Sequence, residues 1–189
     1  MAHAPLIDIV LTRIRRLPMP LNPSSPLARL INGPIHPGRI VWIGLRKRRK
    51  VAMTVVEMAL IDADTGLVGD HYASRGGERQ VTLIQAESLR SIASHLARSD
   101  VAASDLRRNI VTEGINLMAL KDRQFRIGGA VLQTTGECHP CSRMEEVLGT
   151  GGYNAVRGFG GITARVVKGG EIRIGDAIEA LPAALHATG

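Results

Sequence analysis

The chain has 189 residues and a mass of 20.3 kDa, and its 44% hydrophobic and 22% charged residues are ordinary globular values that exclude a fibrous repeat and wholesale disorder. The net charge of +7 is compatible with three classes of binding partner: a small anion, a nucleic acid or an anionic membrane surface. Only 3% of residues are aromatic, which disfavours nucleic-acid binding by base stacking. No apolar run approaches the roughly 20 residues that span a bilayer, and the N-terminus lacks a secretory pattern, so we expect a cytoplasmic protein.

Prolines are concentrated in the first 38 residues, at positions 5, 18, 20, 23, 26, 34 and 37. Proline removes a backbone donor and fixes φ, so this density interrupts regular structure. We therefore predict an N-terminal arm over residues 1–38, with one strand at 7–14 and one short helix at 27–31. A compact domain over 39–183 and a tail over 184–189 follow.

Short β-rich segments alternate with turn residues after the arm. Strands are predicted at 40–45, 51–59, 80–85, 109–112 and 177–181, with a basic run at 46–50 in the loop between the first two. Glycine pairs at 128–129 and 169–170 predict two hairpins, one joining 124–127 to 130–134 and the other joining 162–168 to 171–174.

Two helices are expected among these strands. Over residues 86–97, apolar side chains recur at the spacing of one helix face, and a shorter helix is predicted at 142–148, ended by Gly149. Many short strands with few helices are typical of a mainly β fold with α-helices (α+β), in which a β-barrel carries attached helices. A doubly wound sheet is disfavoured.

The pair Cys138 and Cys141 is the most specific chemical feature of the sequence. It stands just before the helix predicted at 142–148, where unpaired N–H groups and the helix dipole favour a thiolate. The thiolate is the form of cysteine that attacks and that ligates soft metals. His139 and Arg143 are near enough in sequence to add positive charge beside the thiols.

Other interpretations of the cysteine pair stay open. The two thiols could be inert, or they could form a redox dithiol, which their spacing allows. A zinc site could include His71 as a third ligand, but it would need two ligands beyond the pair.

Two further segments could bind a ligand. Gly66 and Gly69 allow a tight turn with close backbone approach, which would let Asp70 and His71 orient a ligand; an ordinary turn is the alternative. Downstream, three polar residues enter a predicted strand: Arg107, Arg108 and Asn109. Guanidinium groups bind anions through planar donor forks, although such arginines can also lie exposed at a sheet rim.

Taken in order, these segments resemble the MOSC family, named for the C-terminal domain of molybdenum-cofactor sulfurases. The resemblance runs from about Trp42 to Ala180. It is carried by the segments 66–71, 79–84, 106–110 and 169–176, together with Gly114, Ile127-Gly128, Pro140-Cys141 and Gly161.

The resemblance implies a MOSC-type β-barrel whose active-site cysteine, directly after a proline, matches Cys141. That residue is then the expected sulfur carrier or molybdenum ligand, and Cys138 is an additional catalytic candidate. The cofactor implied is the molybdenum cofactor, a pterin with a phosphate and a dithiolene. The residues assigned to face it are Arg107, Arg108, Asn109, Gly69, Asp70 and His71, joined by Arg143.

The same resemblance implies a stand-alone MOSC protein that binds molybdenum cofactor or carries sulfur, and some members reduce N-hydroxylated compounds. Pyridoxal phosphate binding is associated with the family as a whole, but the residues before the match are too few for a pyridoxal-phosphate desulfurase. The expected partners are an external sulfur or electron donor and a small-molecule substrate. We also expect a homodimer formed through the arm, and no association with a membrane. The alternatives are a dithiol–disulfide oxidoreductase and a basic module that binds nucleic acid or a protein partner through residues 46–50.

Overall fold

The structure is a computed structural model, in which residues 22–49, 51–72 and 77–182 are described. The chain divides into two units, residues 1–33 and 34–189, and each is described by itself. In the first unit, the predicted short helix is confirmed as α1 (Pro26–Ile31), capped by the Ser25 hydroxyl, which accepts from the Ala28 N–H at 3.1 Å. The strand predicted at 7–14 and the tail at 184–189 lie outside the described residues, and the predicted domain limits stay predictions.

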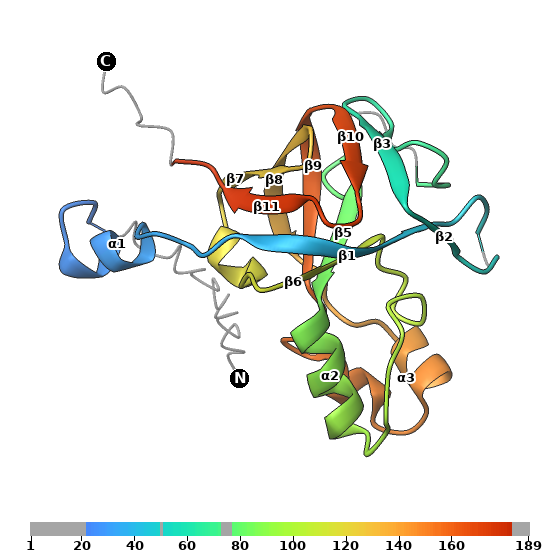
Figure 1. Cartoon of the computed structure of the whole chain (residues 1–189). Coiled ribbons are helices and arrows are strands. Elements are labelled where there is room, and N and C mark those ends of the chain that lie inside the picture. The colour runs from blue at the N-terminus through green and yellow to red at the C-terminus, as the bar shows by residue number, and fades with distance from the viewer. Residues whose placement is uncertain (1–21, 50, 73–76, 183–189) are drawn as a thin grey trace, which may run out of the picture. The chain divides into compact units, whose positions relative to one another are not determined.

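Seven strands of the second unit close into a barrel (Figure 1). Their order around it is β11-β7-β8-β9-β5-β6-β1, and pairing of β1 with β11 completes the ring. The strands are β1 (Gly38–Leu45), β5 (Val81–Gln85), β6 (Ile110–Glu113), β7 (Gln124–Ile127), β8 (Ala130–Glu137), β9 (Ile162–Lys168) and β11 (Ala177–Ala180). A further strand, β2 (Thr54–Val56), extends the sheet beside β1. The predicted mainly β fold with a barrel is thus confirmed.

A small second sheet corrects two predictions. It contains β10 (Gly170–Arg173), β3 (Met58–Asp62) and β4 (Gly66–Leu67) in that order. The single strand predicted at 51–59 is therefore wrong: it is split at Glu57 into β2 and β3, which belong to different sheets.

The second predicted hairpin is also wrong. β9 pairs with β8 and β5, whereas β10 pairs with β3. A two-residue hairpin turn needs positive φ at its glycine, and neither Gly169 nor Gly170 has it. These glycines instead allow close strand crossing, since a Cβ on Gly169 would lie 2.7 Å from the Ile61 carbonyl and one on Gly170 would collide with the Gly129 carbonyl. The first predicted hairpin, β7 with β8, is confirmed.

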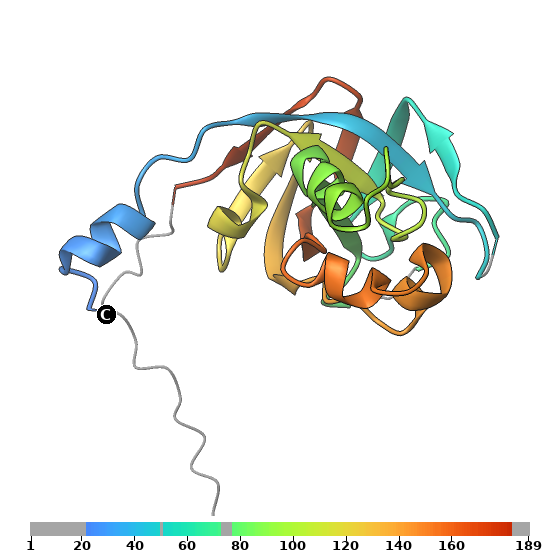
Figure 2. The same ribbon diagram turned by 90° about the horizontal axis from the view of Figure 1, so that it is seen from below.

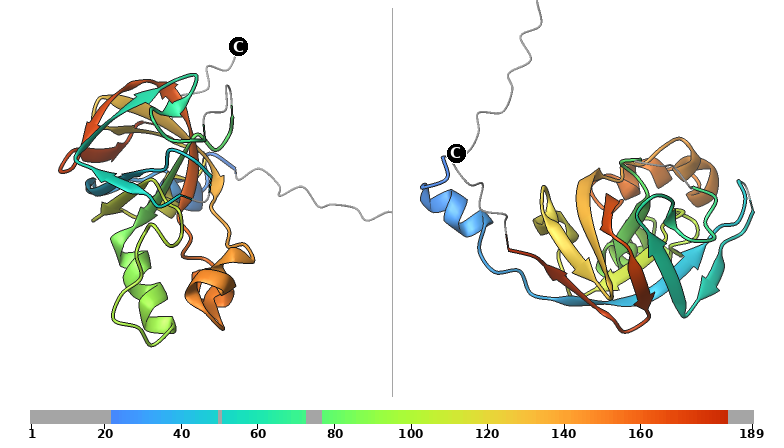
Figure 3. Two further views of the ribbon diagram at one scale, coloured as in Figure 1. Left: turned by 90° about the vertical axis from the view of Figure 1, so that its right-hand side faces the viewer. Right: turned by 90° about the horizontal axis from the view of Figure 1, so that it is seen from above.

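Short helices lie together against one side of the barrel, as Figure 2 and the left view of Figure 3 show for α2 (Ala86–His95) and α3 (Arg143–Leu148). The first ends two residues before its predicted limit, because the chain turns at Ala97 with a φ of +50°. Two further short helices were not predicted from the sequence: α4 (Gly152–Val156) and the 3-10 helix η1 (Leu117–Leu120). No helix of the described ranges has the length and apolar character that crossing a membrane requires.

Two apolar clusters stabilise this arrangement. The barrel interior is filled by side chains such as Ile43, Leu83 and Phe125, which are fully buried. A second cluster between the helices and the barrel wall includes Ile92 of α2 and Met144 of α3. Packing of α3 into the second cluster fixes the segment that begins with the cysteine pair.

Candidate functional site

Two adjoining hollows are built from segments that follow β1, precede β6 and follow β8. The first, called here the thiol hollow, has a volume of about 200 Å³, and the second, the arginine hollow, about 300 Å³. Both are lined by Arg46, Met53 and Arg107. The thiol hollow is also lined by Asp70, Tyr72, Arg79, Thr82, Arg108, Asn109 and Cys138, and the arginine hollow by Val51, Ala52, Ser104, Asp105 and Arg143.

The side chain of Asn109 connects three elements at the thiol hollow. Its Oδ1 accepts a hydrogen bond from the Thr82 hydroxyl at 2.8 Å, on β5. Its Nδ2 donates to Asp70 Oδ2 at 3.1 Å and to the Gly44 carbonyl at 3.3 Å, on β1. Both ends of the amide are thus engaged within the protein, so Asn109 shapes the wall of the hollow.

Asp70 is held by a glycine turn, as the sequence predicted. Gly66 and Gly69 both adopt positive φ, +80° and +89°. The Asp70 side chain is only 5% exposed, and its carboxylate accepts from the Arg46 N–H at 2.8 Å and the Tyr72 N–H at 3.0 Å. The turn therefore fixes Asp70 in the wall of the hollow, while Gly69 itself is exposed.

His71 lies beside the thiol hollow but does not line it. Its ring contacts Arg46 Nη2 at 3.3 Å and Asp70 Oδ1 at 3.3 Å. No group of three histidine, cysteine, aspartate or glutamate side chains gathers among the described residues, so the alternative of a zinc site with His71 finds no support there.

Arg108 is a buried residue, 6% exposed, whose guanidinium bonds to backbone carbonyls. Nε donates to Gly160 at 2.7 Å, Nη2 to Cys138 at 3.3 Å, and Nη1 to Leu106. Burial lowers the pKa of Arg108, and the nearby cysteines Cys138 and Cys141 act in the opposite direction. These contacts fix the loop that carries the cysteine pair.

Arg107 lines both hollows and has an unusual backbone. Its φ of +55° lies in the left-handed region, which residues other than glycine seldom adopt and which is found at binding sites. Burial lowers the pKa of Arg107, and repulsion from Arg143 and Arg46 lowers it further, whereas Cys141 raises it. Arg107 therefore shares the arginine hollow with two other guanidinium groups, those of Arg46 and Arg143.

The two cysteines occupy different environments. Cys138 is 4% exposed and lines the thiol hollow, where its Sγ accepts from Arg79 Nη2 at 3.8 Å. Cys141 is exposed and lines neither hollow, although it acts electrostatically on Arg107 and Arg108. The helix predicted after the pair begins at Arg143, within one residue of its expected start.

Most predicted site residues thus come together. Asp70, Arg108, Asn109 and Cys138 share the thiol hollow, Arg143 lines the arginine hollow, and Arg107 lines both, whereas Gly69, His71 and Cys141 line neither. Five residues that line the thiol hollow were not predicted to face the cofactor: Arg46, Met53, Tyr72, Thr82 and Arg79. Arg46 is the first residue of the basic run, and Arg79 is the first residue of a segment that carries the family resemblance. The sequence therefore offered a reason to consider both as site residues.

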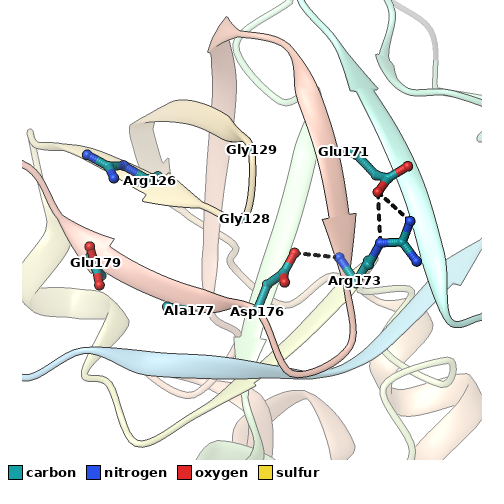
Figure 4. A pocket seen from close by; sticks show the side chains of 8 residues that line it. All are labelled: Arg126, Gly128, Gly129, Glu171, Arg173, Asp176, Ala177 and Glu179. Atoms are coloured by element: carbon teal, nitrogen blue, oxygen red, sulfur yellow. Dashed lines mark hydrogen bonds and ion pairs between the residues drawn. The ribbon is translucent and has the colours of Figure 1, made fainter.

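A third hollow, the carboxylate hollow, is lined mainly by β7, β10 and β11 and is shown in Figure 4. Glu171, Asp176 and Glu179 line it together with Arg126 and Arg173. Arg173 is already paired with Glu171, with Nη2 2.7 Å from Oε1, and its N–H donates to Asp176. This hollow contains neither cysteine and has more acidic than basic side chains.

The family model of the MOSC domain matches residues 67–179, which is more than half of the chain. The chain belongs to the MOSC domain family. The match includes Gly69, the arginine pair and both cysteines, and it confirms the membership expected from the sequence. No protein with curated function matches the chain significantly.

Several solved structures have a similar fold. The YuaD protein of Bacillus subtilis is 20% identical, with a TM-score of 0.68 over 77% of this chain and 96% of that chain. YiiM of Geobacillus stearothermophilus is 17% identical, with a TM-score of 0.63 over 79% and 78% of the two chains. YiiM of Escherichia coli is 18% identical, with a TM-score of 0.59 over 76% and 69%. At these identities the likeness concerns the fold alone.

Proposed function

We propose that this MOSC domain binds the molybdenum cofactor in the two adjoining hollows, with a cysteine of the pair as its sulfur ligand. The observation that carries the proposal is the position of Cys138 in a hollow lined by four arginines. Membership of the MOSC family supports the same cofactor.

The donor set fits such a cofactor. Within the described part of the chain, Arg46 Nε and Nη1 and Arg143 Nε are buried without a hydrogen-bond partner. Unpaired buried donors cost about 1–3 kcal/mol each, so a ligand with acceptor oxygens would be stabilised there. Soft thiolate ligands suit molybdenum as well as transferable sulfur.

Each group has a role in this proposal. Arg46, Arg107 and Arg143 bind the anionic part of the cofactor, and Cys141 or Cys138 supplies the thiolate. Asn109, Asp70 and Arg108 position the loops around them, since their side chains are bonded to protein groups. The bound group would supply an open metal position for oxygen-atom chemistry, as in reduction of N-hydroxylated compounds.

A second form of the function is a sulfur carrier. It is favoured by the exposure of Cys141, because a carrier must offer its sulfur to a donor and to an acceptor protein. In this form Cys141 holds a persulfide and no metal is required. Both forms need an external partner, either an electron donor or a sulfur donor.

Metal and sulfur analysis separates the two forms. The protein would be purified from cells that make molybdenum cofactor and from cells that cannot, and molybdenum, pterin and sulfane sulfur would be measured per chain. One molybdenum and one pterin per chain, only from competent cells, supports cofactor binding; sulfane sulfur on Cys141 without metal supports the carrier. C141S and C138S identify which thiol is required, and a wild-type protein with neither molybdenum nor sulfane sulfur contradicts both forms.

A further inference from the structure

A further hollow, called here the rim pocket, lies at one rim of the barrel and has a volume of about 160 Å³. It is enclosed by η1, by the last residues of β8 and by the first residue of β9, and Glu137 pairs with Ile162 at the point where the two strands meet. Its described lining residues all differ from those of the thiol, arginine and carboxylate hollows. The mouth of a β-barrel is a common place for a small-molecule site.

The rim pocket combines aliphatic walls with one buried hydroxyl that is not hydrogen-bonded. Leu117 and Ile162 line it and are almost completely buried. Thr134 lines it as well and is 6% exposed, and its Oγ1 has no hydrogen-bond partner among the described residues. Because buried hydroxyls in native proteins are normally paired, this one indicates a partner that comes from outside the chain.

A β-bulge shapes the wall that carries this hydroxyl. The register of β8 against β9 shifts between Thr134 and Gly136, so Thr135 is the extra residue. The Thr135 hydroxyl is engaged within the protein, since it donates to the Glu78 carbonyl and lies 2.9 Å from the Thr163 hydroxyl. Bulges are frequent at barrel rims and beside active sites, where they redirect a side chain. At this bulge one threonine is bonded within the protein and its neighbour is left unpaired.

We infer that the rim pocket binds a neutral single-ring molecule whose hydroxyl or amino group bonds to Thr134. An aliphatic cavity of roughly 150 Å³ holds one benzene ring, and the rim pocket has a similar volume. Aliphatic walls offer water few partners, so an apolar ring with one polar substituent suits the pocket better than water alone. The exposed lining residues Lys121, Asp122 and Glu137 carry charges of both signs, which favours a neutral ligand.

The rim pocket also borders the segment that carries the cysteine pair. His139 lines the rim pocket, whereas its neighbour Cys138 lines the thiol hollow. A ligand in the rim pocket therefore contacts the same segment that presents the thiols. The inference does not depend on the proposed function, because the described lining of the rim pocket includes no residue to which a cofactor role is given above.

Phenol is the probe, and toluene is the comparison ligand because it has the same ring without the hydroxyl. A titration of the full chain followed by ¹H–¹⁵N NMR is expected to show one phenol bound per chain, with a dissociation constant of about 1 mM or lower. The amide signals of Thr134 and His139 should shift more than that of Arg107, which lines the other hollows.

T134V tests the hydroxyl, because valine keeps the shape of threonine and removes only the polar group. It should weaken phenol binding about fivefold and leave toluene binding unchanged. Thr112 provides the matched control, since it is also fully buried with an unpartnered hydroxyl but does not line the rim pocket. T112V should therefore bind phenol as the wild type does.

Three results would overturn the site: a folded wild-type protein that does not bind phenol, unchanged phenol affinity in folded T134V, or an equal loss of affinity in T112V. If T134V does not fold, the NMR map of the wild type decides, and shifts centred away from Thr134 and His139 refute the site. A protein that binds phenol here but acquires neither molybdenum nor sulfane sulfur would contradict the proposed function and leave the rim pocket established.

Discussion

The carboxylate of Asp70 and the side-chain amide of Asn109, 39 residues apart in sequence, share a hydrogen bond of 3.1 Å at the thiol hollow. The bond joins the glycine turn after β4 to the start of β6. Asn109→Asp replaces the donor by a second carboxylate, so repulsion and an unpaired acceptor should destabilise the protein by about 1–3 kcal/mol at pH 7. Urea unfolding measures this free energy, with the exposed Asn154→Asp as control; equal stability of both variants would contradict the positioning role.

Arg108 should matter more for stability than its neighbour in the arginine pair. Arg108→Met leaves the carbonyls of Gly160, Cys138 and Leu106 without their donor, at a cost of about 3 kcal/mol or more in the free energy of unfolding. Denaturant unfolding monitored by circular dichroism tests this. A loss below about 1 kcal/mol would mean that the buried guanidinium is dispensable for the fold.

Arg107→Gly is expected to separate stability from binding. Glycine adopts positive φ without strain, so the variant should be as stable as the wild type or more stable by about 1 kcal/mol. Loss of the guanidinium should nevertheless weaken anion binding in both hollows. Thermal unfolding and phosphate titration on the same samples measure the two effects, and a strongly destabilised variant would show that the Arg107 side chain supports the fold.

The carboxyl group of Glu145 makes the stability of the region after the cysteines depend on pH. Hydrogen bonds from the Tyr153 and Gly151 N–H groups lower the pKa of its carboxyl below the usual 4.5. The carboxylate therefore contributes stability above pH 4.5, and this contribution disappears as the pH falls through the lower folded pKa. The stability difference between wild type and Glu145→Gln should shrink on acidification from neutral pH, whereas Glu146→Gln, which removes the same charge from α3, should show no such trend.

The two thiols should react at different rates. Cys141 is exposed and Cys138 is 4% exposed, so a small alkylating reagent should modify Cys141 at least roughly tenfold faster in the native protein. Mass spectrometry of the modified chain over time resolves the two sites. C141S should remove the fast phase and C138S should retain it, and urea should make both cysteines of the wild type react alike; comparable native rates would contradict the described burial.

Local patterns predicted the fold where local geometry decided it. The β7–β8 hairpin and the helix α2 follow from a glycine turn and from apolar spacing, both of which act over a few residues. The split at Glu57 and the separation of β10 from β9 depend on which distant strand is available as a partner. Such pairing is not encoded in the segment itself.

The candidate site was predictable to a similar extent. The glycine turn, the arginine pair and the cysteines were identified because each forms a short sequence motif. Arg46 and Arg79 were missed as site residues because they reach the thiol hollow only through the closed barrel, by way of β1 and β5. The different exposure of Cys138 and Cys141 likewise follows from tertiary packing rather than from their spacing.

The pairing of β1 with β11 has a consequence for how the molecule is made. Gly38 and Arg39 lie opposite Ile178 and Ala177, so the ring joins the first and last strands of its unit. Contacts this distant in sequence slow folding, because a long loop must be ordered before they form. During synthesis, the barrel can close only after its final strand has left the ribosome, and the carboxylate hollow, which β11 helps to line, remains incomplete until then.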